Sequence, residues 1–181
     1  MSETYPRWRY YPQHVAPQNW VEELVDVFSN AQGEIDSSKV QGLESDGVLK
    51  VIRPGLQSLG YLVEKGKKKT DRLARPVLFG DQGHPRVNYE IDAALEEVGV
   101  LLEVEAGRGW MGNAVYRDLI RTSLIVVARY LALCVMNEYR YKSGGKQTVS
   151  RDFQLASDQL DAIYASGRLA FPFEGVLLVG Y

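Results

Sequence analysis

Hydrophobic residues recur at helical spacing in several separate parts of the chain. Residues 17–32 place Trp20, Leu24, Val27 and Phe28 on one side of a predicted helix. Further helices are predicted over 46–60 and 149–166, and from Asn113, a good N-cap residue, to about Val127. Within 46–60, Pro54 is expected to break or kink the helix.

Elsewhere the pattern changes to a period of two. It predicts strands over 76–81, 86–95 and 98–106, which are joined by short turn-like spacers, the second at Glu96–Gly99. Residues 130–141 and 175–181 are apolar enough for buried strands, and 61–66 is a short candidate strand. The aromatic, Pro-punctuated residues 1–15 predict an extended arm. The order indicates a mixed α/β domain over 1–181: a three-strand meander, a crossover helix and a strand returning parallel to 98–106.

Composition and charge add limits on function. The 181 residues fit one domain with a sizeable core, and the single Cys134 excludes an intramolecular disulfide framework. With no apolar run of membrane-spanning length and no signal-peptide pattern at the start, we expect a cytoplasmic protein. The net charge of −2 hides a basic stretch over 64–75 that could hold DNA phosphates or be a solvated loop. Its candidate contacts are Lys67, Lys68, Lys69, Arg72 and Arg75.

A glycine motif follows the predicted strand 98–106. Gly107, Gly109 and Gly112 match the dinucleotide-binding pattern, lie between a strand and a helix, and are followed downstream by an acid, Glu138. The strand before them carries two carboxylates, which would repel a pyrophosphate, and the chain after Gly112 is too short for the rest of a six-stranded cofactor domain. We favour a turn from strand to helix and keep a nucleotide-cofactor protein as an alternative.

Carboxylates gather on the same two predicted strands. Glu103 and Glu105 share one strand face, and pairing around Glu96–Gly99 brings Asp92 near Glu103. Converging carboxylates are costly unless they are solvated, protonated or bridged by a cation. Oxygen ligands favour Mg²⁺, with Mn²⁺ or Ca²⁺ as substitutes. An exposed sheet face of solvated acids is the open alternative.

The spacing of these acids, with its context, resembles a known nuclease family. Asp92, ten intervening residues and Glu103-Val104-Glu105 resemble the signature of the PD-(D/E)xK superfamily, in the Glu-x-Glu variant of BamHI- and BglII-type restriction endonucleases. The words "NYEIDAALEEVGVLLEVEAGRGWMGNAVYRDLI" are similar to the core of that group, and the likeness is best over 67–141.

The resemblance implies a restriction-endonuclease-like α/β core and a Mg²⁺-dependent DNA endonuclease that acts as a homodimer. Asp92 and Glu103 would be metal ligands, helped by the backbone carbonyl of Val104. Glu105 stands where the usual lysine lies and would bind a second metal or act as general base. Arg108 is a candidate contact to the scissile phosphate, and Glu34 or Glu44 a candidate additional acid. The alternative within the same fold is a non-catalytic DNA-binding or assembly protein.

Overall fold

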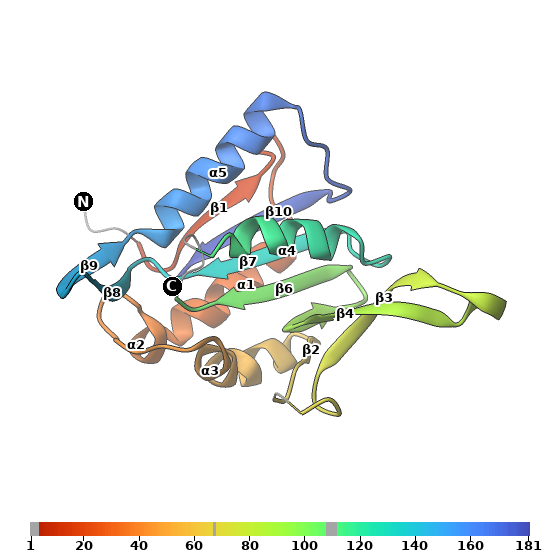
Figure 1. Cartoon of the computed structure of the whole chain (residues 1–181), viewed down its shortest axis with the longest axis horizontal. Helices are drawn as coiled ribbons and strands as arrows, with labels where there is room; N and C mark the ends of the chain where they lie inside the picture. The colour runs from red at the N-terminus through yellow and green to blue at the C-terminus, as the bar shows by residue number, and fades with distance from the viewer. Residues whose placement is uncertain (1–3, 67, 108–111) are drawn as a thin grey trace.

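A six-stranded mixed sheet forms the centre of the molecule (Figure 1). The structure is a computed structural model and describes residues 4–66, 68–107 and 112–181. The strand order is β1-β10-β7-β6-β5-β2. Three central strands run parallel: β6 (Val100–Glu105), β7 (Tyr130–Val135) and β10 (Gly175–Gly180). The outer strands pair antiparallel: β1 (Arg7–Tyr11), β5 (Ala93–Leu95) and β2 (Leu62–Val63).

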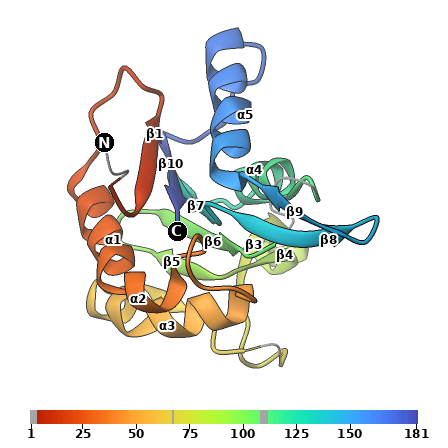
Figure 2. The same ribbon diagram turned by 90° about the vertical axis from the view of Figure 1, so that its left-hand side faces the viewer.

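Helices cover both faces of this sheet (Figure 2). One face carries α1 (Asn19–Asn30), α2 (Gln32–Ile35) and α3 (Ser45–Ser58), and the other α4 (Ala114–Ser123) and α5 (Asp152–Ser166). Every residue of β7 and β10 is buried, as expected for parallel strands covered on both faces. Leu102 and Val104 of β6 pack toward α1 and α3, whereas Leu101 packs toward α4 and α5.

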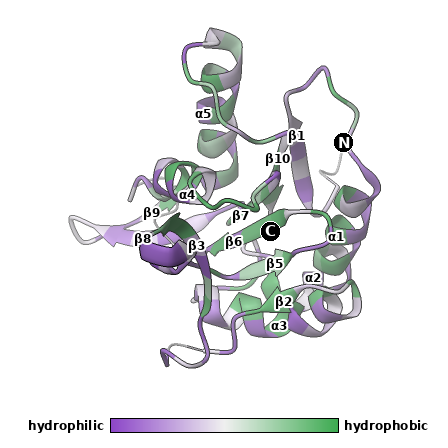
Figure 3. Cartoon of the chain, turned by 90° about the vertical axis from the view of Figure 1, so that its right-hand side faces the viewer, coloured by the Kyte–Doolittle hydropathy of each residue, from purple (hydrophilic) through white to green (hydrophobic). Residues whose placement is uncertain are grey.

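Two hairpins stand apart from the main sheet. The first pairs β3 (Leu73–Phe79) with β4 (Pro85–Ile91) across a short 3₁₀ turn, η1 (Asp81–Gly83). The second pairs β8 (Tyr139–Ser143) with β9 (Lys146–Ser150). Figure 1 shows β3–β4 projecting at one end of the molecule and β8–β9 at the other, and in Figure 3 hydrophobic residues concentrate in the central strands.

The main predictions for the fold are confirmed. The chain is a mixed α/β domain with a central mixed sheet flanked by helices. The turn at Glu96–Gly99 joins β5 to β6, and the chain returns through α4 to β7, which lies parallel to β6. Among the described residues, no helix is both long and apolar enough to cross a membrane.

Some local predictions were wrong, mostly where tertiary contacts override the local pattern. The helix α3 continues through Pro54, because Ile52 and Leu56 are buried against the core on either side of it. The predicted N-terminal arm contains the edge strand β1, whose residues Tyr10 and Tyr11 are buried. The predicted strand 86–95 is divided by a bend at Asp92, so β3 and β4 form a separate sheet. The helix α4 ends at Ser123, earlier than predicted, and residues 139–150 form a hairpin.

A candidate carboxylate site

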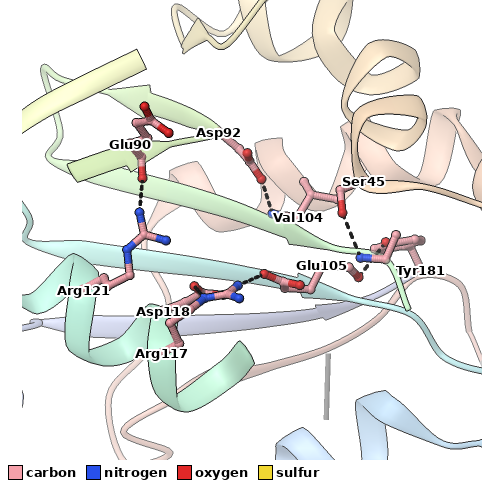
Figure 4. A network of polar contacts seen from close by, with 10 residues as sticks. Ser45, Glu90, Asp92, Val104, Glu105, Arg117, Asp118, Arg121 and Tyr181 are labelled. Carbon is pink, nitrogen blue, oxygen red and sulfur yellow. Dashed lines mark hydrogen bonds and ion pairs between the residues drawn. The ribbon is translucent and has the colours of Figure 1, made fainter. Parts of the chain in front are cut away.

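Asp92 and Glu103 meet where the β4–β3 hairpin joins the main sheet. Asp92 lies in the bend between β4 and β5, and the pairing of Ala93 with Leu102 sets it beside Glu103. One carboxylate oxygen of Asp92 accepts a hydrogen bond from the Val104 amide at 2.7 Å (Figure 4). The bend therefore turns Asp92 back toward β6.

Glu103 is not part of a solvated sheet face. Its residue surface is only 8% exposed, and it projects from β6 on the side covered by α4. Among the described residues no side chain hydrogen-bonds its carboxylate, although the Arg121 guanidinium lies within electrostatic reach. Burial, together with the charges of Asp92 and Asp118, raises the pKa of Glu103 well above its usual range. The exposed-face alternative is therefore wrong for this residue.

The other two acids also have raised pKa values. Burial raises the pKa of Asp92 to about 7, and the charges of Glu64 and Asp118 add to this, while the Val104 hydrogen bond opposes it. Burial and the charge of Asp118 raise the pKa of Glu105 to about 7, against the opposing effect of Arg117. Burial is the largest cause of these shifts, and repulsion between the neighbouring acids adds to it, so the acids form a cluster in which negative charge is costly. A cluster of this kind favours either protons or a bound cation.

Asp118 is a fourth carboxylate that sequence reasoning missed. It lies on α4, is 1% exposed, and receives a hydrogen bond from Arg117 Nε at 2.9 Å. Arg117 also forms an ion pair with Glu105, so one arginine joins the two acids (Figure 4). The spacing of residues in the sequence does predict that Asp118 faces inward. Asp118 stands four residues after Ala114 and three after Val115, both buried, which is the spacing of the inward face of the helix.

The neighbourhood of Asp92 includes acids from two other segments. The Glu64 amide, just after β2, donates a hydrogen bond to the Asp92 carbonyl at 2.8 Å. The charge of Asp46, in the first turn of α3, also raises the pKa of Asp92. Asp46 is therefore a further acid within electrostatic reach of Asp92, beside the predicted candidates Glu34 and Glu44. Glu44 is the N-cap residue of α3, and Glu34 lines a cavity between α1 and α3.

Two contacts secure the end of β6 beside the carboxylates. The Ala106 amide donates to the Ser45 hydroxyl at 3.2 Å, and the Tyr181 hydroxyl donates to the Glu105 carbonyl at 2.8 Å. Tyr181 is fully buried. These bonds join α3 and the residue after β10 to the strand that carries Glu103 and Glu105, so the position of that strand end is defined by distant parts of the chain.

The residues suit a hard divalent cation in chemistry, but they are not assembled as a complete site. Asp92 and Glu103 supply oxygen donors and hold charge shielded from water that a cation would neutralise, and the nearby Cys134 packs with the core on the α1 and α3 side of the sheet. Within 4–66, 68–107 and 112–181, however, no three histidine, cysteine, aspartate or glutamate side chains are grouped so as to hold a metal. The ion pair with Arg117 engages the Glu105 carboxylate. For Val104, the structure shows its amide in contact with Asp92.

The predicted basic contacts fall into three groups. Lys68 and Lys69 are exposed on the loop that starts beside Asp92 at Glu64. Arg72 pairs with Glu90, and Arg75 pairs with Glu96 at 2.6 Å. Lys67 and Arg108 lie outside the described residues. The loop thus carries exposed positive charge, while Arg72 at its end and Arg75 on β3 are engaged with acids of the protein.

The glycine motif is described only in part, because Gly109 also lies outside the described residues. Gly107 has a φ of 75°, a left-handed conformation that favours glycine. A Cβ on Gly107 would lie 2.9 Å from Cε2 of the Tyr139 ring. Tyr139 therefore packs against Gly107 at the place where a nucleotide-binding loop would need space for phosphates. This favours a structural role for Gly107.

Comparison with known proteins identifies the fold. No family model and no curated protein sequence matches the chain. Among solved structures, the restriction endonuclease BglII complexed with a DNA 16-mer is similar, with a TM-score of 0.54 and 14% identity, over 98% of this chain and 78% of that one. Free BglII gives a TM-score of 0.47 and 13% identity, over 98% and 79% of the two chains. At this identity the likeness concerns the fold, which is restriction-endonuclease-like.

Proposed function

We propose that this protein is a Mg²⁺-dependent DNA endonuclease, consisting of one restriction-endonuclease-like domain over 1–181. One observation carries the proposal: the partly buried Asp92 and the buried Glu103 lie side by side on neighbouring strands of a restriction-endonuclease-like sheet, and among the described residues neither forms an ion pair. Two carboxylates this close together and shielded from water are costly unless they are protonated or bridged by a cation. A divalent cation offsets the cost and gives the pair a chemical use.

Each residue of the site has a role in this proposal. Asp92 and Glu103 would hold the metal, together with the backbone carbonyl of Val104. A bound Mg²⁺ supplies Lewis acidity toward a phosphate oxygen and lowers the pKa of a bound water. Glu105, whose pKa is raised to about 7, would accept a proton from the attacking water. Arg117 positions Glu105 through their ion pair and balances part of the charge of Asp118.

DNA is the expected substrate because positive charge lies next to these acids. The loop with Lys68 and Lys69 leaves the sheet directly beside Asp92, so phosphates held there lie close to the carboxylates. The similar BglII structure was solved with a DNA 16-mer. We also propose Lys67, Arg72, Arg75 and Arg108 as DNA contacts, with Arg72 and Arg75 exchanging their acidic partners for phosphates.

We also propose a homodimer formed through α4. Tyr116, Ile120 and Leu124 recur every four residues along this helix and are 42%, 53% and 51% exposed. These three carry no charge, so the stripe is complementary to a second copy of itself in a two-fold arrangement. Asp118 lies on the opposite side of the same helix. Two copies joined here would bring two sites into one assembly, one for each DNA strand.

Plasmid cleavage tests the proposed activity. The wild type should convert supercoiled plasmid to nicked or linear DNA with Mg²⁺, and Glu103→Gln should slow this by about a hundredfold or more, the scale on which loss of one group that stabilises a transition state slows catalysis. The matched control is Glu97→Gln, in the exposed turn before β6, which should cleave as the wild type does. Cleavage that is equal in all three proteins would refute the assignment.

The second candidate is a non-catalytic DNA-binding or assembly protein of the same fold. The observation in its favour is the Glu105–Arg117 ion pair, which occupies an acid that a nuclease would need. Binding of duplex DNA without cleavage in Mg²⁺, Mn²⁺ or Ca²⁺ would support this candidate and exclude the enzyme.

A further inference from the structure

The β8–β9 hairpin is basic and carries no acid. Residues 139–150 contain three cations, Arg140, Lys142 and Lys146, and neither aspartate nor glutamate. Its turn is made by Gly144 and Gly145, which have φ values of 56° and 79°. An isolated two-stranded ribbon is marginally stable in water, so its position depends on contacts at its base.

The base of the hairpin is fixed next to the carboxylate site. β8 follows β7, and the last residue of β7, Val135, pairs with Glu105. The Tyr139 ring packs against Gly107, two residues after Glu105, and stacks on the Tyr141 ring with centroids 5.5 Å apart. Arg140 donates a hydrogen bond to the Ser38 carbonyl at 3.0 Å and pairs with Glu138. The hairpin therefore keeps a defined direction relative to the end of β6.

The tip of the hairpin differs from its base. Lys142 and Lys146 are both exposed, and neither forms an ion pair with any acid in the part of the chain that the structure describes. Lys142 lies opposite Gln147, and Lys146 lies opposite Ser143, so the two lysines stand on opposite faces of the ribbon. In Figures 2 and 3 this tip projects outward on the side of the sheet that carries α4. The same side carries Glu103 and Asp118.

We propose that the β8–β9 hairpin is a second DNA-binding element, whose Lys142 and Lys146 bind backbone phosphates of the duplex that reaches the carboxylate site. A two-stranded ribbon has the width of the major groove, and cations on its two faces are placed for the phosphates on either side. The loop with Lys68 and Lys69 leaves from the Asp92 side of the site, whereas the hairpin leaves from the Glu105 side. A duplex across the site would be held at both ends. This inference rests on the proposed function.

The salt dependence of DNA binding tests the hairpin directly. A labelled duplex is titrated with wild type and with the double variant Lys142→Ala/Lys146→Ala, in Ca²⁺ to prevent turnover, over a range of salt concentrations. Loss of two phosphate contacts should make the negative slope of log K against log salt shallower by about 1.8. The matched control is Lys50→Ala/Arg168→Ala, which removes two exposed cations from α3 and from the residues after α5. It should leave the slope unchanged.

A second measurement relates binding to cleavage. Single-turnover cleavage in Mg²⁺ at a protein concentration below that needed for saturation should slow in the hairpin variant as its binding weakens, and it should be unchanged in Lys50→Ala/Arg168→Ala. An unchanged salt slope in the hairpin variant overturns the hairpin proposal and leaves the endonuclease proposal standing. A wild type that binds no duplex DNA overturns both. Tighter binding of single strands than of duplexes, with the same loss in the variant, overturns the assignment to a duplex groove.

Discussion

Removing the charge of Asp92 should stabilise the metal-free protein. Asp92→Asn keeps an oxygen that accepts the Val104 hydrogen bond, so the substitution changes charge more than shape. Burial raises the pKa of Asp92 from an ordinary value of 3.8 to about 7 in the folded state. The folded state binds this proton more tightly than the unfolded chain does. The free energy of unfolding therefore falls as pH rises from 3.8 to about 7, and this loss of stability is constant at higher pH.

The size of the effect follows from that shift. A tenfold change in proton affinity is worth about 1.4 kcal/mol, so Asp92→Asn should gain at most about 4 kcal/mol at about pH 8 and about 2 kcal/mol at about pH 5. The side chain is only partly buried, and the water that reaches it screens the charge and reduces these figures. The gain should nevertheless be larger at the higher pH.

Urea unfolding in the presence of a chelator measures this gain. Wild type, Asp92→Asn and the control Asp26→Asn, an exposed position on α1, are compared at both pH values. Adding Mg²⁺ at the higher pH should stabilise the wild type and have little effect on Asp92→Asn, because the cation needs the carboxylate. An Asp92→Asn variant that is less stable than the wild type at about pH 8, or that gains the same stability at both pH values, would contradict a destabilising charge at Asp92.

Three other substitutions test separate parts of the structure. Ile120→Glu should convert the dimer to a monomer in sedimentation experiments, whereas the control Leu169→Glu, at an exposed apolar residue elsewhere, should remain a dimer. A dimer that survives Ile120→Glu would exclude α4 as the dimer interface. Gly107→Ala should cost about 1–3 kcal/mol in urea unfolding, since alanine is strained at a φ of 75° and meets the Tyr139 ring; an unchanged midpoint would contradict this. Tyr181→Phe should cost about 1–2 kcal/mol by the same assay, because the Glu105 carbonyl loses its buried donor, and a neutral result would show that water replaces the hydroxyl.

The spacing of hydrophobic residues along the chain was sufficient to predict several strands and helices. The strands on either side of Glu96–Gly99 and the helix after Asn113 follow from spacing over a few residues, and they led to the antiparallel pairing that brings Asp92 beside Glu103. The parallel return to β7 followed from the order of the elements. The sequence by itself therefore determined the fold class and the strands that carry the candidate acids.

The tertiary structure alone decided which charges act together. The bend at Asp92, the buried position of Asp118 and the pairing of Arg117 with Glu105 join residues from different elements, and a period along the chain contains no information on such pairs. The placement of β1 at the sheet edge and of the β8–β9 hairpin beside Gly107 was decided in the same way. The physical reason is that burial and Coulomb energy depend on distance through space, which is set only when the layers pack.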